Sequence, residues 1–183
     1  MCKPVIVIIS ASSEKQDTPG GAHHGGWLFA LSTDGFIMHM AEFVGAESLP
    51  QRYFFLAAVK DEFPNITVAV HDDACHLRKY ATARAADGTM AASLAYPSMQ
   101  YIVDRLHAKG HVDPWCKQHC LPDVPSNAAL LQNRNTQACE QKFSILGRHK
   151  FKLKCMRQFT AGMYMNEIVE LLNKSHLPSQ QRQ

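Results

Sequence analysis

The sequence predicts a mixed α/β domain in which a central strand and a hairpin precede strands that alternate with helices. Residues 5–9 are continuously apolar and mostly β-branched, as in a strand that is buried on both faces. Two strand-like segments flank Thr33-Asp34-Gly35, which is a strong hairpin signal. A second buried-type strand, Ile66–His71, follows a segment with helical spacing. The chain of 183 residues is long enough to bury a substantial core.

The first half of the chain is expected to form a hairpin, a helix, a strand and a second helix. Residues 10–26 are rich in Ser, Gly and His and predict a loop, and residues 27–32 and 36–43 predict the two strands of the hairpin. Ser48 as N-cap and Pro50 in the first turn predict a helix that runs to about Phe63. After the strand Ile66–His71, the Ala- and Arg-rich residues 75–86 predict a helix that Asp87-Gly88 ends.

In the second half, residues 90–100 predict a helix interrupted at Pro97, and residues 101–106 either a strand or the end of that helix. Three prolines predict an irregular segment at residues 114–126. Residues 137–149 and 158–172 predict helices. We therefore expect one domain at residues 1–175 and a polar tail at residues 176–183. This order is the plan of the ribonuclease H-like fold, here with a Cys/His-rich loop inserted.

Composition and charge indicate a globular protein that is mildly basic. The hydrophobic share is 46%, the charged share is 19% and the formal net charge is +3. Basic residues concentrate at Arg148, Lys150, Lys152, Lys154 and Arg157. This strip either contacts the phosphates of DNA or forms a solvated helix face.

The N-terminal apolar run is short for a signal peptide and far too short to span a bilayer. Six cysteines do not make a disulfide scaffold in a chain of this size, and two of them lie among histidines. We therefore expect a soluble intracellular protein without a membrane partner.

Two carboxylates are candidates for a metal-dependent phosphoryl-transfer site. Asp72 follows the strand Ile66–His71, so it is expected at the carboxyl end of the sheet, where open α/β sheets place their sites. Glu140, on the predicted helix 137–149, can lean toward Asp72 and share Mg²⁺ or Mn²⁺ with it. The alternatives are that Asp72 or Asp73 caps the next helix and that Glu140 is an exposed surface residue.

The Cys/His-rich loop supplies the nitrogen and thiolate ligands that tetrahedral Zn²⁺ favours. The candidate ligands are His107, His111, Cys116 and Cys120. Cys75-His76, just past the first strand end, can replace one of them. The loop holds either a structural zinc ion or unligated side chains. Asp104 either orients one histidine or is a third carboxylate of the acidic site.

At these residues the chain resembles the catalytic region of the Kyakuja–Dileera–Zisupton (KDZ) transposases of eukaryotes. The matching motifs are His71-Asp72-Asp73-Ala74-Cys75, then residues 103–111 (Val-Asp-Arg-Leu-His-Ala-Lys-Gly-His) followed by Cys116, then residues 135–143 (Asn-Thr-Gln-Ala-Cys-Glu-Gln-Lys-Phe). The resemblance covers roughly residues 25–173. Three motifs in the same order make it more specific than any one alone.

The resemblance implies a ribonuclease H-like core that cuts and joins DNA with acidic residues and Mg²⁺. Asp72 would be the metal-binding Asp of the fourth strand, and Glu140 the carboxylate of the last catalytic helix. The family's acidic and metal-binding-like cluster would correspond to Asp104, His107, His111, Cys116 and Cys75. The resemblance also implies DNA, such as transposon ends, as partner and the nucleus as location, and it allows a homo-oligomer.

The chain departs from the family on its first strand, where the family has an Asp. Residues 5–12 contain no carboxylate, and Glu14 and Asp17 come later. The family's N-terminal cysteine-rich DNA-binding modules are also missing, so we expect a truncated or decayed copy. Because a two-metal site needs the charge of all its carboxylates, we expect catalysis to collapse while the fold persists.

Three functions therefore compete. The first is a transposase-derived DNA-processing domain, active or inactive, that uses Asp72, Glu140 and Asp104. The second is a non-catalytic, zinc-stabilised module that binds DNA or protein through the basic strip. The third is an unrelated intracellular enzyme with a catalytic zinc ion in the Cys/His loop.

Overall fold

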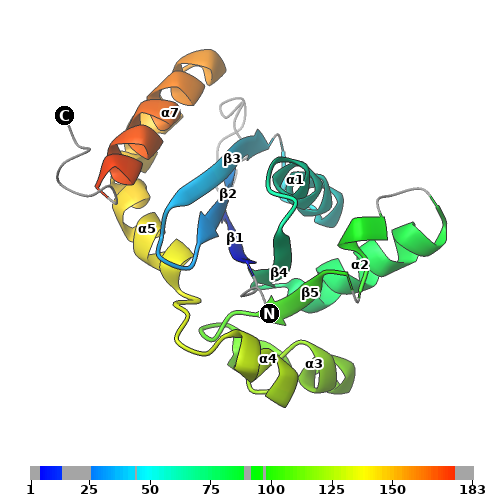
Figure 1. Ribbon diagram of the computed structural model, residues 1–183. Coiled ribbons are helices and arrows are strands. Elements are labelled where there is room, and N and C mark those ends of the chain that lie inside the picture. The colour runs from blue at the N-terminus through cyan, green and yellow to red at the C-terminus, as the bar shows by residue number, and fades with distance from the viewer. Residues whose placement is uncertain (1–4, 14–25, 44, 89–91, 97, 176–183) are drawn as a thin grey trace.

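Five strands form one mixed sheet in the order β3-β2-β1-β4-β5 in the computed structural model of the chain (Figure 1). The structure describes residues 5–13, 26–43, 45–88, 92–96 and 98–175. β1 (Val5–Ser13), β2 (Gly26–Ser32) and β3 (Ile37–Phe43) form an antiparallel meander. β4 (Ile66–His71) and β5 (Gln100–Val103) follow on the other side of β1, all three being parallel. The predicted α/β class with a mixed sheet is therefore confirmed.

Helices cover both faces of this sheet (Figure 1). α1 (Leu49–Glu62) and α2 (Ala74–Ala86) pack on one face. α5 (Ala138–Leu146) and α7 (Gln158–Lys174) pack on the other. None of the described helices is both long and apolar enough to cross a bilayer.

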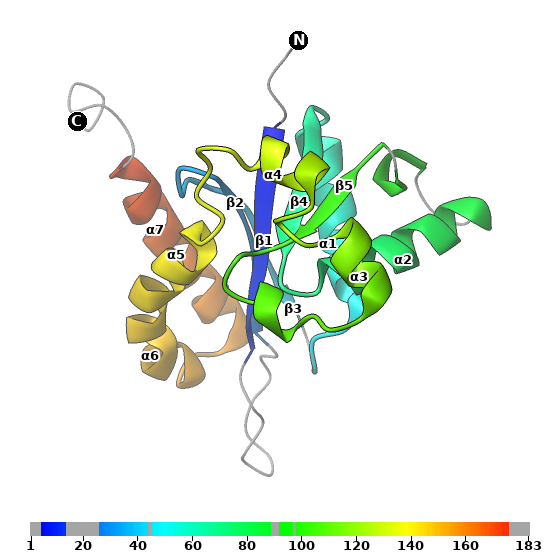
Figure 2. The same ribbon diagram turned by 90° about the horizontal axis from the view of Figure 1, so that it is seen from below.

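Short elements complete the second half of the chain. α3 (Pro114–His119) and α4 (Pro125–Leu130) lie beyond β5, in front of the sheet when it is seen from below (Figure 2). α6 (Lys150–Lys154) leads from α5 toward α7. The 3₁₀ helices are η1 (Ala92–Leu94), η2 (Ala108–Gly110) and η3 (Gly147–His149).

Alternation along the strands divides the core into two halves, because successive strand residues face opposite sides. Val7 and Ala69 belong to the half under α1 and α2. Ile8, Val70 and Ile102 belong to the half under α5 and α7. The side of the sheet on which a strand-end residue emerges therefore follows from its parity.

Several predicted boundaries were wrong for physical reasons. β1 continues through residues 10–13, which were expected to be loop, because these residues pair with β2 up to Ser13 and Gly26. Residues 90–100 form no long helix in their described part, which contains η1 and the first residue of β5. The prolines at 114 and 125 begin α3 and α4 instead of preventing them, since the first helical position needs no N–H. Residues 14–25 and the expected tail at 176–183 lie outside the described residues.

Asn173, near the end of α7, fastens that helix to the outer strand β3. Its Oδ1 accepts a hydrogen bond from the Ile37 N–H at 2.9 Å, and its Nδ2 donates to the Ile37 carbonyl at 2.8 Å. The amide therefore satisfies both main-chain groups of Ile37, a residue that is itself buried.

Replacing Asn173 by Leu should lower the free energy of unfolding by about 1–3 kcal/mol, because both polar groups of Ile37 lose their partner. Urea denaturation would measure the change. Asn166→Leu is the matched control, since Asn166 is exposed on the same helix. Equal midpoints for the two variants would contradict this role of Asn173.

Candidate metal centre and acidic site

The carboxyl ends of β4 and β5 lie side by side and carry two of the three candidate acids. His71 pairs with Val103 in the parallel register, so Asp72 and Asp104 directly follow paired residues. Both keep the parity of Val70 and Ile102 and therefore emerge on the α5 side of the sheet.

Glu140 approaches the same region from α5. The Cys139 thiol donates to the Ile8 carbonyl at 3.5 Å, which seats the first turn of α5 on β1. Burial raises the pKa of Cys139, and the charges of Glu140 and Asp104 raise it further. Glu140 itself is exposed. The two carboxylates thus lie near the same thiol.

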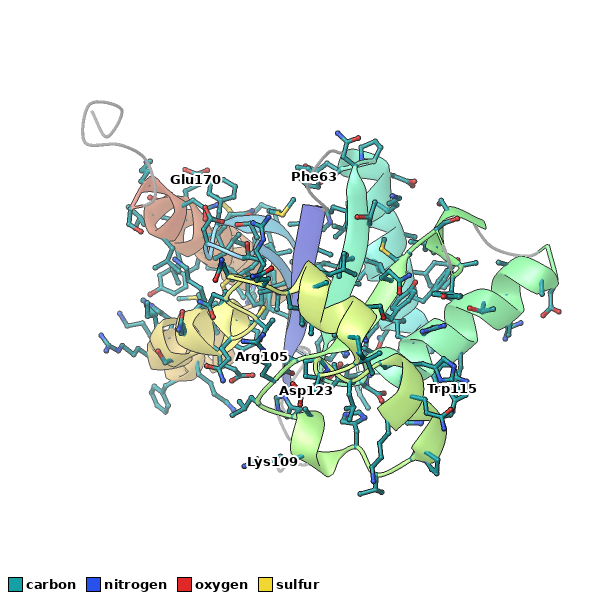
Figure 3. The ribbon with its side chains drawn as sticks, turned by 60° about the horizontal axis from the view of Figure 1, so that its bottom comes forward. Phe63, Arg105, Lys109, Trp115, Asp123 and Glu170 are labelled. Atoms are coloured by element: carbon teal, nitrogen blue, oxygen red, sulfur yellow. The ribbon has the colours of Figure 1, made fainter. Side chains whose placement is uncertain are left out.

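Asp104 is largely buried and organises a tight turn around His107. Its Oδ1 accepts from the N–H groups of Leu106 at 2.7 Å and His107 at 3.1 Å, and its Oδ2 lies 2.6 Å from His107 Nδ1. Of the two roles considered for Asp104, orientation of a histidine is the one these contacts describe. Arg105 and Lys109 are exposed cations of the same connection (Figure 3).

His107 lies in the negative field of all three candidate acids. The hydrogen bond with Asp104 is the main reason that its pKa is raised, and the charges of Asp104, Asp72 and Glu140 add to this effect. Among the described residues, however, the acids do not form a group whose ligand atoms all lie within 4.8 Å of one another. The structure gathers them around His107 without bringing their oxygens together.

Asp72 is half exposed and lies beside the buried His71, a contact that the sequence did not indicate. Its Oδ1 is 2.7 Å from His71 Nδ1, which also lies 2.8 Å from the N–H of Asp73. Burial by itself would raise the pKa of Asp72. The hydrogen bond with His71 and the charges of His71 and Arg52 outweigh burial and hold the pKa well below its usual range. Asp72 is therefore a carboxylate at neutral pH.

Asp73 has a structural role. It occupies the N-cap position of α2 but makes no side-chain cap hydrogen bond. Instead, its carboxylate accepts from Arg52 at 2.8 Å and contacts His76, while Arg52 also pairs with Glu47 at 2.6 Å. This network joins the start of α1 to the turn after β4.

Three of the predicted zinc ligands converge. His111 Nδ1 lies 3.5 Å from Cys75 Sγ and 3.4 Å from Cys116 Sγ, and the two sulfurs are buried. We call Cys75, His111 and Cys116 the Cys/His cluster. A tetrahedral zinc ion with Zn–S of about 2.3 Å and Zn–N of about 2.0–2.1 Å would separate these atoms by roughly 3.6 Å. The cluster can therefore hold a metal ion such as zinc.

The other predicted ligands lie around this cluster. His107 is outside it, because none of its ring nitrogens lies within 4.8 Å of all three ligand atoms of the cluster. Cys120 is buried next to the cluster, and the charge of Cys75 affects its thiol. His76 belongs with Asp73 and Cys75 to a second, more exposed group of potential ligands. A fourth ligand could thus come from Cys120, from His76 or from water.

Two buried thiols of this region, those of Cys116 and Cys120, hold their protons tightly. Burial raises the pKa of Cys116 to about 12, helped by a hydrogen bond with Cys75 and by neighbouring negative groups. Burial likewise raises the pKa of Cys120 to about 11, although Arg78 opposes the shift. A metal ion must displace these protons, so its binding should weaken as the pH falls.

Arg78 braces this region, a role that the sequence did not reveal because helix arginines are usually solvated. Its guanidinium lies 3.7 Å from the Tyr96 ring centroid and 5.2 Å from that of Trp115, which Figure 3 labels. It also donates to the His119 carbonyl at 3.3 Å. These contacts hold α3, and with it Cys116, against α2.

The predicted DNA-binding strip lies on η3, α6 and the start of α7. Arg148, Lys150, Lys152 and Arg157 are exposed, and the side chain of Lys154 lies outside the described part of the chain. Comparison of the sequence and fold with protein-family models, curated proteins and solved structures finds no match.

The Asp104–His107 pair should stabilise the protein more in acid than in alkali. Because the pKa of His107 is raised in the folded state, the contribution is complete below the unfolded pKa of about 6.5 and disappears as the pH rises through the folded value. We expect His107→Gln to cost about 0.2–1 kcal/mol at the acid end, given the partial exposure of His107.

Urea denaturation with a metal chelator, compared between about pH 5.5 and about pH 9, would measure this effect. Asp104→Asn removes the other partner, and the double variant gives the coupling free energy between the two side chains. A coupling that does not change with pH would contradict the assignment.

Proposed function

We propose that this chain is a transposase-derived DNA-processing domain of the ribonuclease H-like type whose acidic site is one carboxylate short. The observation that carries the proposal is the strand plan. An antiparallel meander, β1 to β3, is followed by β4 and β5 on the other side of β1 and parallel to it. This is the arrangement expected from the resemblance to KDZ transposases.

The positions of the candidate acids support the same proposal. Asp72 directly follows β4, Glu140 lies on the first turn of the helix that packs on β1, and both act electrostatically on His107. Ionised carboxylates at the end of a parallel sheet fit a hard divalent cation such as Mg²⁺ or Mn²⁺. Side-chain adjustment would be needed to bring their oxygens onto one ion.

In such a site each residue would have a definite task. Asp72 and Glu140 would hold the cation, which would stabilise negative charge on the attacking and leaving oxygens of a phosphodiester. Asp104 would keep His107 oriented, and the exposed Arg105 and Lys109 would attract the DNA backbone.

The missing carboxylate belongs beside Asp72. Ile8 of β1 pairs with Val70 of β4, and extending this parallel register by two residues leads from Ser10 to Asp72. The family resemblance calls for an Asp on this first strand, and Ser10 cannot supply the charge. We infer that the site binds the cation weakly and that cleavage is lost for this reason.

A carboxylate at position 10 should therefore restore DNA cleavage. We expect the unmodified protein to cleave terminal-repeat DNA with Mn²⁺ no faster than Asp72→Ala, whereas Ser10→Asp should cleave measurably above both. The gain should vanish in Ser10→Asp combined with Glu140→Gln. A gel-based cleavage assay would measure these rates.

Thr67→Asp is the matched control, because it adds one carboxylate to the opposite end of β4, where the side chain is exposed. If Ser10→Asp behaves like Thr67→Asp in a correctly folded protein, the nuclease ancestry of the site is refuted. If the unmodified protein already cleaves in an Asp72-dependent manner, the site is complete and the inference about Ser10 is wrong.

A second candidate function is a zinc-stabilised module that binds DNA or protein without catalysis. The Cys/His cluster is the observation that favours it, since its S–N distances of 3.4 and 3.5 Å match those around a tetrahedral zinc ion. A metal ion there would tie the loop between β5 and α3 to the start of α2. Such a module and a decayed transposase domain are compatible, because the cluster does not include the acids.

The purified protein should retain about one zinc ion per chain. Cys75→Ser, His111→Ala and Cys116→Ser should each lose it and lower the melting temperature, whereas His107→Ala should keep it because His107 lies outside the cluster. Elemental analysis and thermal melts would measure both effects. Cys155→Ser is the control, since Cys155 is exposed on α6's C-terminal side. Full stability and no zinc in the unmodified protein would remove the site.

A further inference from the structure

The positive charge of the chain is concentrated between Glu140 and Glu167. Residues 141–166 contain six Lys and Arg side chains and no Asp or Glu. Since the whole chain carries a net charge of +3, all other residues together carry −3. This asymmetry favours a polyanion as the partner of this segment.

Its first residues end α5 and include the buried Lys142. The rest of the segment folds into one corner of the molecule, formed by η3, α6 and the first half of α7, which we call the α6–α7 corner (Figure 2). His149 and Tyr164 hold it together, with Nδ1 and Oη 2.8 Å apart and the rings in edge contact. Four of its cations, Arg148, Lys150, Lys152 and Arg157, are exposed on this corner of the folded chain.

Two aromatic side chains stand out from this corner among the cations. Phe151 is 79% exposed between Lys150 and Lys152, and Phe159 is 80% exposed two residues after Arg157. The neighbouring Leu153 and Met156 are half-buried. Other apolar side chains of the corner therefore pack inward, whereas the two rings do not. Exposed aromatic rings interleaved with cations are typical of surfaces on which unpaired bases stack.

A hollow of about 450 Å³ continues this surface between α7 and β3. Phe159, Gly162 and Met163 form its apolar part. Gln158, Asn166 and Glu42 give it polar groups, and Gln158 Nε2 donates to Glu42 Oε2 at 3.2 Å. Amide and carboxylate groups of this kind recognise the polar edges of bases, and a carboxylate accepts from an exocyclic amino group.

We propose that the α6–α7 corner binds single-stranded DNA. The cations contact the phosphates, Phe151 and Phe159 stack on bases, and the hollow receives one unpaired base that carries an exocyclic amino group. Double-stranded DNA could use the cations but not the rings, because its base faces are stacked inside the duplex. The inference deepens the proposed function by naming the form of DNA, and it does not depend on the acidic site.

Fluorescence anisotropy with labelled oligodeoxycytidine, oligodeoxythymidine and a duplex would test the proposal. We expect oligodeoxycytidine to bind best, because the exocyclic amino group of cytosine can donate a hydrogen bond to the Glu42 carboxylate and thymine has no such group. Phe151→Ala and Phe159→Ala should each weaken single-strand binding roughly five- to hundredfold. Lys152→Gln should weaken all three DNAs and reduce the salt dependence.

Phe54→Ala is the matched control, since Phe54 is 57% exposed on α1, on the other face of the sheet. Thermal melts should show that all three Phe variants stay folded. Equal binding by the Phe variants and the unmodified protein, equal affinity for single strand and duplex, or no DNA binding would each overturn the proposal. So would a dimer that Phe159→Ala dissociates without a change in DNA affinity, because the surface would then serve a second copy of the chain.

Single-strand binding and DNA cleavage can be tested independently, because they depend on different residues. Ser10→Asp and Asp72→Ala should leave single-strand binding unchanged, because Ser10 lies in β1 and Asp72 directly follows β4, and neither belongs to the α6–α7 corner. Loss of binding in Phe159→Ala with cleavage by Ser10→Asp intact would support both proposals independently. Binding without any restored cleavage would leave the corner supported and the nuclease ancestry refuted.

Discussion

Parallel pairing of β1, β4 and β5 is the constraint on which the two candidate sites depend. Parallel strands end at the same border of a sheet, so the connections that follow β4 and β5 must start side by side. This border brings together side chains that are more than thirty residues apart, such as Cys75 and His111. Neither the acidic site nor the Cys/His cluster could form from one connection alone.

The turn after β4 links the two sites mechanically. Asp72 faces the α5 side of the sheet. Cys75, three residues later, lies in the first turn of α2 on the other side and belongs to the Cys/His cluster. A metal ion bound by Cys75, His111 and Cys116 would therefore fix the backbone that carries Asp72. Without metal, the Cys116 thiol keeps its proton, and the attachment of the turn to the cluster rests on weaker hydrogen bonds. Zinc content should thus be controlled in any measurement on the acidic site.

Sequence patterns predicted what short-range physics decides. The apolar run that ends at His71 placed β4 and Asp72 correctly, and Gly35, with φ of 90°, forms the turn between β2 and β3 that Thr33-Asp34-Gly35 indicated. The ligand set could not be resolved in this way, because His107 and His111 have the same chemistry. Only the folded turn shows that Asp104 engages the first histidine and leaves the second to the cysteines.

On each outer strand of the sheet, one residue has main-chain groups that are already hydrogen-bonded, so a further strand could not pair there. At β3 the amide of Asn173 occupies the N–H and carbonyl of Ile37, and at β5 the N–H of Val103 donates to the carbonyl of Cys120 at 2.8 Å. Strand-by-strand growth into fibrils or swapped dimers would first have to break these bonds. The α7 helix and the loop before Asp123 therefore act as local guards of the two sheet edges, each at the strand residue that it contacts.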